Sequence, residues 1–136
     1  MQLTKFSDYA LRAMIFAASA PDELVTIDKV SETFDISRAH LKKVMNRLSN
    51  AGYLEAVRGR KGGFRLAVPP AEINLGSVIR LTESSLDCFE CQSCLIAGNC
   101  HLAGIGGQAM AAFMAVFDGK SLYDILLPPK AFERRE

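Results

Sequence analysis

Apolar residues recur along the opening segment of the chain with the spacing of an α-helix. They are Leu3, Phe6, Leu11, Met14, Ile15 and Ala18. This spacing predicts an amphipathic helix over residues 3 to 19. Thr4 or Ser7 is suited to cap its start, and Pro21 ends it.

Two more helices are predicted directly afterwards. Thr26 is placed as the N-cap of a helix that runs to Phe34, residues 35–36 interrupt it, and Ser37 caps a second helix over residues 38–50. Two helices joined by a short turn are typical of a helix-turn-helix unit. A plain helical pair with a solvated polar face is the alternative. The inner face of the second helix carries Leu41, Val44 and Leu48.

The outer face of that second helix is polar and basic. Such residue types reach phosphates and base edges in the major groove of DNA. We therefore predict a DNA-binding surface that comprises this outer face and the N-cap of the preceding helix. Its residues are Thr26, Ser37, Arg38, His40, Lys42, Lys43 and Asn46.

A strand pattern follows the helix pair. Residues 53–57 and 64–68 alternate as two short strands, and the glycine-rich segment 58–63 between them predicts a hairpin. A helix-turn-helix with such a hairpin is a winged helix, and its tip is suited to contact the minor groove or its phosphates. A solvated hairpin is the simpler interpretation. The cations at the tip are Arg58, Arg60 and Lys61.

The second half of the chain is more apolar. A short helix over residues 78–83, begun by Asn74 or Ser77, is expected before a long helix over residues 102–117. The long helix has few charges, which is typical of a helix buried against something. We predict dimerisation through it, with packing inside the monomer as the alternative, and we expect the tail from Pro128 to fray. Its main apolar positions are Met110, Phe113, Met114 and Phe117.

These elements define the expected fold class. It is mainly α with a small β-wing: a winged helix-turn-helix followed by a long C-terminal dimerisation helix. Residues 1–68 would form the DNA-binding domain, and residues 69–136 would hold the cysteines and the dimerisation helix.

Charge supports this interpretation only locally. The formal net charge of the 136-residue chain is +1. Residues 26–65, however, hold nine Lys or Arg against four Asp or Glu, a bias typical of a surface that faces phosphates. Catalysis is not expected, because the sequence has no phosphate-binding loop, no nucleophile–base pair and only two histidines.

All four cysteines of the chain lie within residues 88–100, a segment called here the cysteine loop. A short loop brings thiolates together at low entropic cost. The sequence opens without a secretory leader and has no apolar run of about 20 residues, so we expect a cytoplasmic protein without a membrane segment. In that reducing compartment, clustered thiols are metal ligands or redox groups rather than structural disulfides.

The opening residues 1–13, the helix-turn-helix, the wing 57–66 and the cysteine loop together resemble the NsrR/IscR-type winged-helix regulators. The resemblance implies a homodimer carrying an iron–sulfur cluster on Cys88, Cys94 and Cys100, each separated by five residues. In NsrR-like members an aspartate of the partner subunit completes the site, and Asp8 stands in that motif. An ion pair of this aspartate with Arg12 is the simpler interpretation.

One position after the cysteine loop distinguishes the branches of that family. IscR-like members have a histidine three residues beyond the last cysteine, where this chain has Ala103. The resemblance therefore favours an NsrR-like 4Fe–4S cluster over 2Fe–2S. Cys91 is surplus to the three-cysteine pattern, and it is either a ligand, a spare thiol or a partner in a disulfide.

The function implied is that of a transcriptional regulator, predicted to repress. It would bind a palindromic double-stranded operator under control of the cluster, with nitric oxide, oxygen or iron status as the signal. One rival is a winged-helix regulator with zinc or no metal in the loop, switched by thiol oxidation. A thiol redox enzyme using Cys91 and Cys94 is disfavoured, because its usual βαβ context is absent.

Overall fold

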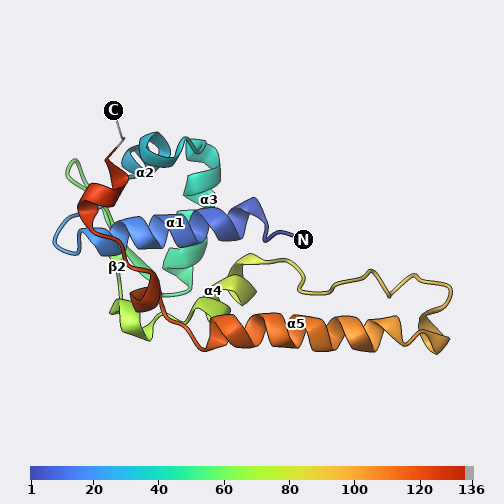
Figure 1. Cartoon of the computed structure of the whole chain (residues 1–136). Helices are drawn as coiled ribbons and strands as arrows, with labels where there is room; N and C mark the ends of the chain where they lie inside the picture. Colours follow the sequence, from blue (N-terminus) through green and yellow to red (C-terminus); the bar gives the residue numbers. More distant parts are fainter. Residues whose placement is uncertain (134–136) are drawn as a thin grey trace.

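The computed structural model describes residues 1–133. Within them lie five α-helices, four 3-10 turns and one two-stranded antiparallel sheet (Figure 1). The predicted mainly α architecture with a small β-wing and a long C-terminal helix is confirmed. The elements are α1 (Lys5–Ser19), α2 (Ile27–Phe34), α3 (Arg38–Asn50), β1 (Leu54–Val57), β2 (Gly63–Leu66), η1 (Pro70–Glu72), α4 (Leu75–Thr82), η2 (Ala97–Asn99), α5 (Leu102–Asp118), η3 (Leu122–Ile125) and η4 (Pro129–Phe132).

Side-chain caps set where the first four helices begin. The hydroxyls of Thr4, Thr26 and Ser37 each accept a hydrogen bond from a backbone N–H in the first turn of α1, α2 and α3. A cap of this kind contributes about 1 kcal/mol. Thr4 rather than Ser7 is thus the cap of α1. Asn74 Oδ1 accepts from the Ser77 N–H at 2.9 Å, so α4 begins three residues before the predicted start at residue 78.

The turn between α2 and α3 is held by one left-handed residue. Asp35 has φ 55°, a conformation that short polar side chains tolerate. The Ile36 N–H donates to Ser31 O at 3.2 Å, and the Ser31 hydroxyl donates back to Ile36 O at 2.6 Å. These bonds fix the angle between the two helices, and Ile36 is buried beneath the turn.

The hydrophobic core is built around α1, which packs on α3, α4 and β2. Small residues on α1 let the neighbouring helices approach closely. Large apolar side chains from α3, α4 and η3 fill the remaining space. The fully buried members include Ala10, Ala13, Met14, Leu41, Val44, Leu48, Val78, Ile79 and Leu122.

The wing is joined to the core at its root. β1 and β2 pair with Leu54 opposite Leu66 and Val57 opposite Gly63. β1 therefore starts one residue later than predicted and ends at the predicted residue, whereas β2 starts one residue earlier and ends two residues earlier. Val25 and Phe64 exchange two backbone hydrogen bonds of 2.7 Å. The hairpin is therefore also held to the segment that precedes α2.

The prediction of a frayed tail from Pro128 is wrong over residues 129–132. These residues form η4, and the ring centroid of Phe132 lies 5.0 Å from that of Phe16 and 6.0 Å from that of Phe34. Edge-to-face contact among three half-buried aromatic rings outweighs the chain entropy of the tail. Residues 134–136, also part of that prediction, lie outside the described residues. No helix within residues 1–133 is long and apolar enough to cross a membrane.

Candidate DNA-binding surface and cysteine loop

Burial sets which way the residues of α3 point. Leu41, Val44, Met45 and Leu48 are buried. The remaining positions of the helix are exposed, as the sequence predicts, except for Ser49, which is half-buried with its Oγ in the interior. The structure leaves all of the predicted α3 contacts exposed, together with Thr26: they are Ser37, Arg38, His40, Lys42, Lys43 and Asn46.

Several of these side chains already have protein neighbours. Arg38 Nε donates to Asp28 Oδ1 at 2.8 Å across the turn, with both side chains more than half exposed. The His40 ring lies 6.2 Å from the Tyr9 ring, centroid to centroid. A capping hydroxyl accepts a backbone N–H and still has its own proton to donate. Thr26 and Ser37 can thus serve as caps and contact a phosphate as well.

The wing tip is the second exposed basic element. Arg58, Arg60 and Lys61 are all exposed, whereas Arg65 on β2 is ion-paired with Glu55 on β1. β1 follows α3 closely, and the Tyr53 N–H donates to Leu48 O at 3.0 Å. The wing and the outward face of α3 are therefore two basic surfaces on one rigid unit.

The cysteine loop lies in the connection between α4 and α5, residues 83–101, which runs alongside α5 (Figure 1). Cys88, Cys91 and Cys100 are half-buried and Cys94 is exposed, and all four are free thiols. The loop advances through tight turns: the N–H groups of Cys94, Ala97 and Asn99 donate to carbonyls three residues back.

The thiols fit an iron–sulfur cluster by their chemistry, since cysteine thiolates are the usual ligands of such clusters. Across residues 1–133, no three Cys, His, Asp or Glu side chains converge as a metal-holding group. Asp8 lies on α1 and forms an ion pair with Arg12 Nε at 2.8 Å. The predicted DNA contacts are therefore brought together within one chain, whereas the predicted ligands are not.

Glu83, at the base of the cysteine loop, ties it to the start of α1. Its Oε1 accepts hydrogen bonds from the Thr4 N–H at 2.8 Å, the Thr4 hydroxyl at 2.9 Å and the Ser7 hydroxyl. The Ser7 Oγ also lies 2.6 Å from Thr82 Oγ1. Partial burial alone would raise the pKa of the Glu83 carboxyl, but the bonds from Ser7 and Thr4 outweigh it and lower that pKa. Sequence reasoning missed this anchor, because its partners lie almost 80 positions apart.

This anchor gives the fold a pH dependence. The folded-state pKa of Glu83 is below its ordinary value of 4.5, so the stabilisation is present above that pH and is lost as the pH falls through the folded pKa. The carboxylate is partly exposed, so we expect about 1 kcal/mol. Urea unfolding at pH 7 and pH 3 measures it. The gap in the free energy of unfolding between wild type and Glu83→Gln should narrow from pH 7 to pH 3, and an unchanged gap would contradict the assignment.

Gly106 forms a seat for the cysteine loop on α5. A Cβ at this buried position would lie 2.9 Å from the Phe89 ring and 3.3 Å from Cys88 Cβ. The Cys88 Sγ–H donates to Gly106 O at 3.4 Å. The absence of a side chain at Gly106 thus lets Phe89 and Cys88 lie against the helix.

Gly106→Ala is expected to displace the loop from this seat. The added methyl group contacts the Phe89 ring too closely, and the amides of residues 86–91 should exchange with solvent roughly tenfold faster, as a loss of about 1.4 kcal/mol implies. Gly107→Ala is the matched control, because a Cβ there meets no atom within 4 Å. It should leave exchange unchanged. Hydrogen exchange measured by mass spectrometry distinguishes the two variants. Equal exchange rates in both would contradict the claim that Gly106 holds the cysteine loop against α5.

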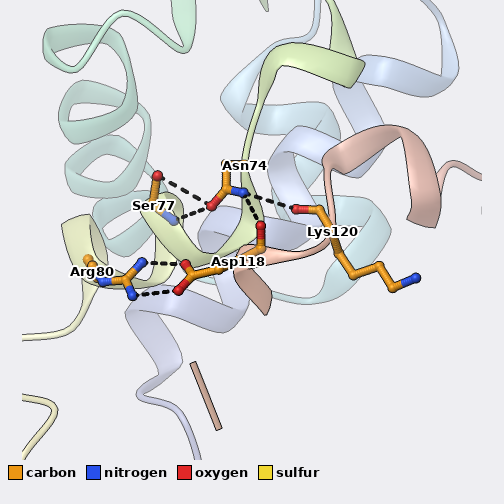
Figure 2. Close-up of polar contacts among 5 residues, drawn as sticks. All are labelled: Asn74, Ser77, Arg80, Asp118 and Lys120. Carbon is orange, nitrogen blue, oxygen red and sulfur yellow. Dashed lines mark hydrogen bonds and ion pairs between the residues drawn. The ribbon is translucent and has the colours of Figure 1, made fainter. Parts of the chain in front are cut away.

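The far end of α5 is clamped to α4 (Figure 2). Arg80 makes a two-pronged ion pair with Asp118, with Nη2 to Oδ2 at 2.8 Å, and this contact lowers the pKa of the Asp118 carboxyl. Asn74 Nδ2 donates to Asp118 O at 2.8 Å, while the Leu75 N–H donates to Lys120 O at 3.0 Å. A Cβ on Gly76 would lie 1.9 Å from Asp118 Oδ1. The C-terminal end of α5 is therefore fixed to the start of α4.

α5 has an inward and an outward apolar face. The four large residues singled out in the sequence turn inward: Met114 is buried, and Met110, Phe113 and Phe117 are half-buried. Phe117 packs against the hydrophobic core, and Met110 and Phe113 line a hollow with Leu3 and Leu86. A different set is exposed at alternating spacings of three and four, and is called here the outer row. It comprises Leu102 (48% exposed), Ile105 (61%), Ala109, Ala112 and Val116 (65%).

Comparison with known proteins identifies relatives over nearly the whole chain. The chain is 42% identical over 132 residues to the HTH-type transcriptional regulator NsrR of Bacillus subtilis, covering 93% of this chain and 90% of that protein. It is 40% identical, with the same coverage, to the NsrR of Geobacillus kaustophilus.

Solved structures agree with these relatives. IscR of T. potens superposes with a TM-score of 0.75 at 25% identity, covering 92% of this chain and 85% of that one. The oxidised form of Staphylococcus aureus CymR gives 0.74 at 25% identity, covering 100% and 99%. The resemblance drawn from the sequence is confirmed. Residues 3–127 match the model of the Rrf2 family, described as iron-dependent transcriptional regulators, and the chain belongs to that family.

Proposed function

We propose that this chain is a DNA-binding transcriptional regulator, acting as a repressor, whose operator binding is controlled by an iron–sulfur cluster. The observation that carries the DNA-binding part is the outward face of α3, where cations and amides are exposed beside a basic wing. The family match and the NsrR relatives support the regulatory part.

On DNA, α3 would lie in the major groove. Asn46 is suited to read an adenine edge, and Lys42 and Lys43 to contact a guanine edge or phosphates. The wing cations Arg58, Arg60 and Lys61 would follow the backbone or the minor groove beside it. Ser37 and Thr26 stand at helix starts, where hydroxyl and N–H groups favour a phosphate.

Two copies would bind a palindromic operator. The outer row of α5 has the three-four spacing by which apolar residues of two helices interlock, and its exposure in the monomer leaves it open to a second copy. A dimer places two α3 helices against two half-sites about one helical turn apart. This accounts for the long apolar helix in so small a protein.

Cys88, Cys94 and Cys100 would hold the cluster, of the 4Fe–4S type, and Asp8 of a second copy would complete the site. A bound iron–sulfur cluster would supply reactivity toward nitric oxide and oxygen. Within this chain, Glu83 joins the base of the cysteine loop to the first turn of α1, and α1 packs on α3. A change in the loop thereby reaches the DNA-binding helix through direct contacts.

The DNA-binding assignment is tested by Lys42→Ala combined with Lys43→Ala. Loss of two cations facing phosphates is expected to weaken operator binding about 10- to 100-fold and to lower the salt slope of the affinity by about 2. Lys120→Ala combined with Lys130→Ala is the control, because both exposed lysines lie after α5 and the pair removes the same two charges. Fluorescence anisotropy over a salt series provides the measurement. Equal operator affinity of the α3 double variant and the control would contradict the assignment of the DNA-binding surface to α3.

A further inference from the structure

We propose that Cys91 and Cys94 are a redox pair that closes to an intramolecular disulfide in the cluster-free protein. The Cys94 N–H donates to Cys91 O at 3.3 Å, with Gln92 and Ser93 as the central turn residues. Such a turn brings its first and fourth Cα atoms within about 7 Å. A disulfide needs about 4.4 to 6.8 Å between Cα atoms. The backbone thus already places these two cysteines near bonding distance.

The other cysteines are placed differently. Cys88 lies against α5, where its Sγ–H donates to Gly106 O. The N–H of Cys91 donates to Phe89 O at 3.1 Å, so residues 88 to 91 do not close the same turn. A further turn and η2 separate Cys94 from Cys100. The turn geometry therefore selects Cys91 and Cys94 from the possible pairs.

The pair is accessible to small oxidants. Cys94 is exposed, Cys91 is half-buried, and Glu90, Gln92 and Ser93 around them are exposed as well. A reagent in solvent reaches Cys94 without any opening of the core. Cys94 is thus the thiol that reacts first and Cys91 the one that resolves it.

The oxidant in this proposal is a peroxide, and hydrogen peroxide is the simplest one. The Cys94 thiolate attacks one peroxide oxygen, the O–O bond breaks, and a sulfenic acid and one water form. The Cys91 sulfur then attacks the Cys94 sulfur, the S–S bond forms, the S–O bond breaks and a second water leaves. Two thiols lose two electrons in total, and one peroxide is reduced to two waters.

The consequence rests on the proposed function, in which Cys94 is a cluster ligand. The disulfide removes its sulfur from the donor set, because a disulfide sulfur is no longer a thiolate. The oxidised loop therefore cannot take up a cluster until a dithiol reduces it. This gives the surplus Cys91 a role. A chain that has only lost its cluster can take up a new one, whereas a chain with the Cys91–Cys94 disulfide must first be reduced.

The pair is tested on the full-length cluster-free protein, reduced, freed of reductant and treated with hydrogen peroxide. No Lys or Arg lies between Arg80 and Lys120, so trypsin leaves all four cysteines on one peptide. Cleavage after Glu90 and after Leu95 instead releases residues 91–95 alone. Mass spectrometry should find this fragment two hydrogens lighter and resistant to alkylation.

Matched variants complete the test. Cys91→Ser should abolish the closed fragment, and Cys88→Ser should retain it. Fragments linking Cys88 or Cys100 instead, or four alkylatable thiols after peroxide, would overturn the pair. Reconstitution with iron and sulfide then checks the consequence: oxidised protein should load less than a tenth of the cluster of reduced protein. Equal loading would overturn Cys94 as a ligand while leaving the disulfide itself standing.

Discussion

Cys100→Ser is expected to yield a colourless protein without iron or sulfide after anaerobic purification. A serine hydroxyl is a poor substitute for a thiolate at iron, and only two of the three proposed loop ligands would remain. The loss should be complete rather than graded. Wild type should instead show broad brown absorbance with matched iron and sulfide, and nitric oxide should bleach it and release the operator.

Cys91→Ser is the matched control for this experiment. It changes the same atoms at a cysteine of the same loop that lies outside the five-residue spacing, and it should keep full colour and full response. Loss of the cluster in Cys91→Ser with retention in Cys100→Ser would reverse the ligand assignment. A colourless wild-type protein containing zinc would favour the rival regulator instead.

Ile105→Glu is expected to convert a dimer to a monomer and to weaken operator binding by at least 100-fold. Ile105 is 61% exposed and is the second residue of the outer row. A carboxylate there would be buried without a partner charge at a helix–helix interface, which costs several kcal/mol in association. A monomer also binds only one half-site of the operator, so the contacts with the second half-site are lost. Light scattering gives the mass in solution, and anisotropy gives the affinity.

The control places the same charge elsewhere on the same helix. Ala111→Glu adds a carboxylate at an exposed position of α5 that lies off the outer row. It should leave mass and affinity unchanged, since its side chain stays in water. A monomeric wild type, or a dimer that tolerates Ile105→Glu, would show that the outer row is not the interface.

Local signals account for what the sequence predicted well. The hydroxyl caps Thr26 and Ser37 mark helix starts through bonds to residues three positions away, and both were placed correctly. The Asp8–Arg12 ion pair also follows from spacing on one helix turn. The start of α4 was missed because Asn74 and Ser77 were both plausible caps, and the helix was begun beyond them.

Contacts between segments far apart in the chain could not be predicted from the sequence. Nothing near Glu83 indicates that its carboxylate meets Thr4 and Ser7, and nothing near Gly106 indicates that Phe89 lies on it. The candidate site was likewise predictable only where local sequence signals determine it. Periodicity placed the polar residues of α3 correctly on its exposed side, whereas the cysteine spacing named candidate ligands without fixing where their side chains point.

The ring of Phe132 has a consequence for how the chain is synthesised. It packs on Phe16 and Phe34, so α1 and α2 receive this contact only from a segment that is synthesised about 100 residues later. At about 5 to 20 residues per second, Phe16 and Phe34 wait several seconds for this third aromatic ring. During that interval Phe16 and Phe34 remain open to chaperones or to neighbouring nascent chains. A chain that ends before Phe132 would keep every α-helix of the described residues and the wing, yet would lack the ring that packs on Phe16 and Phe34.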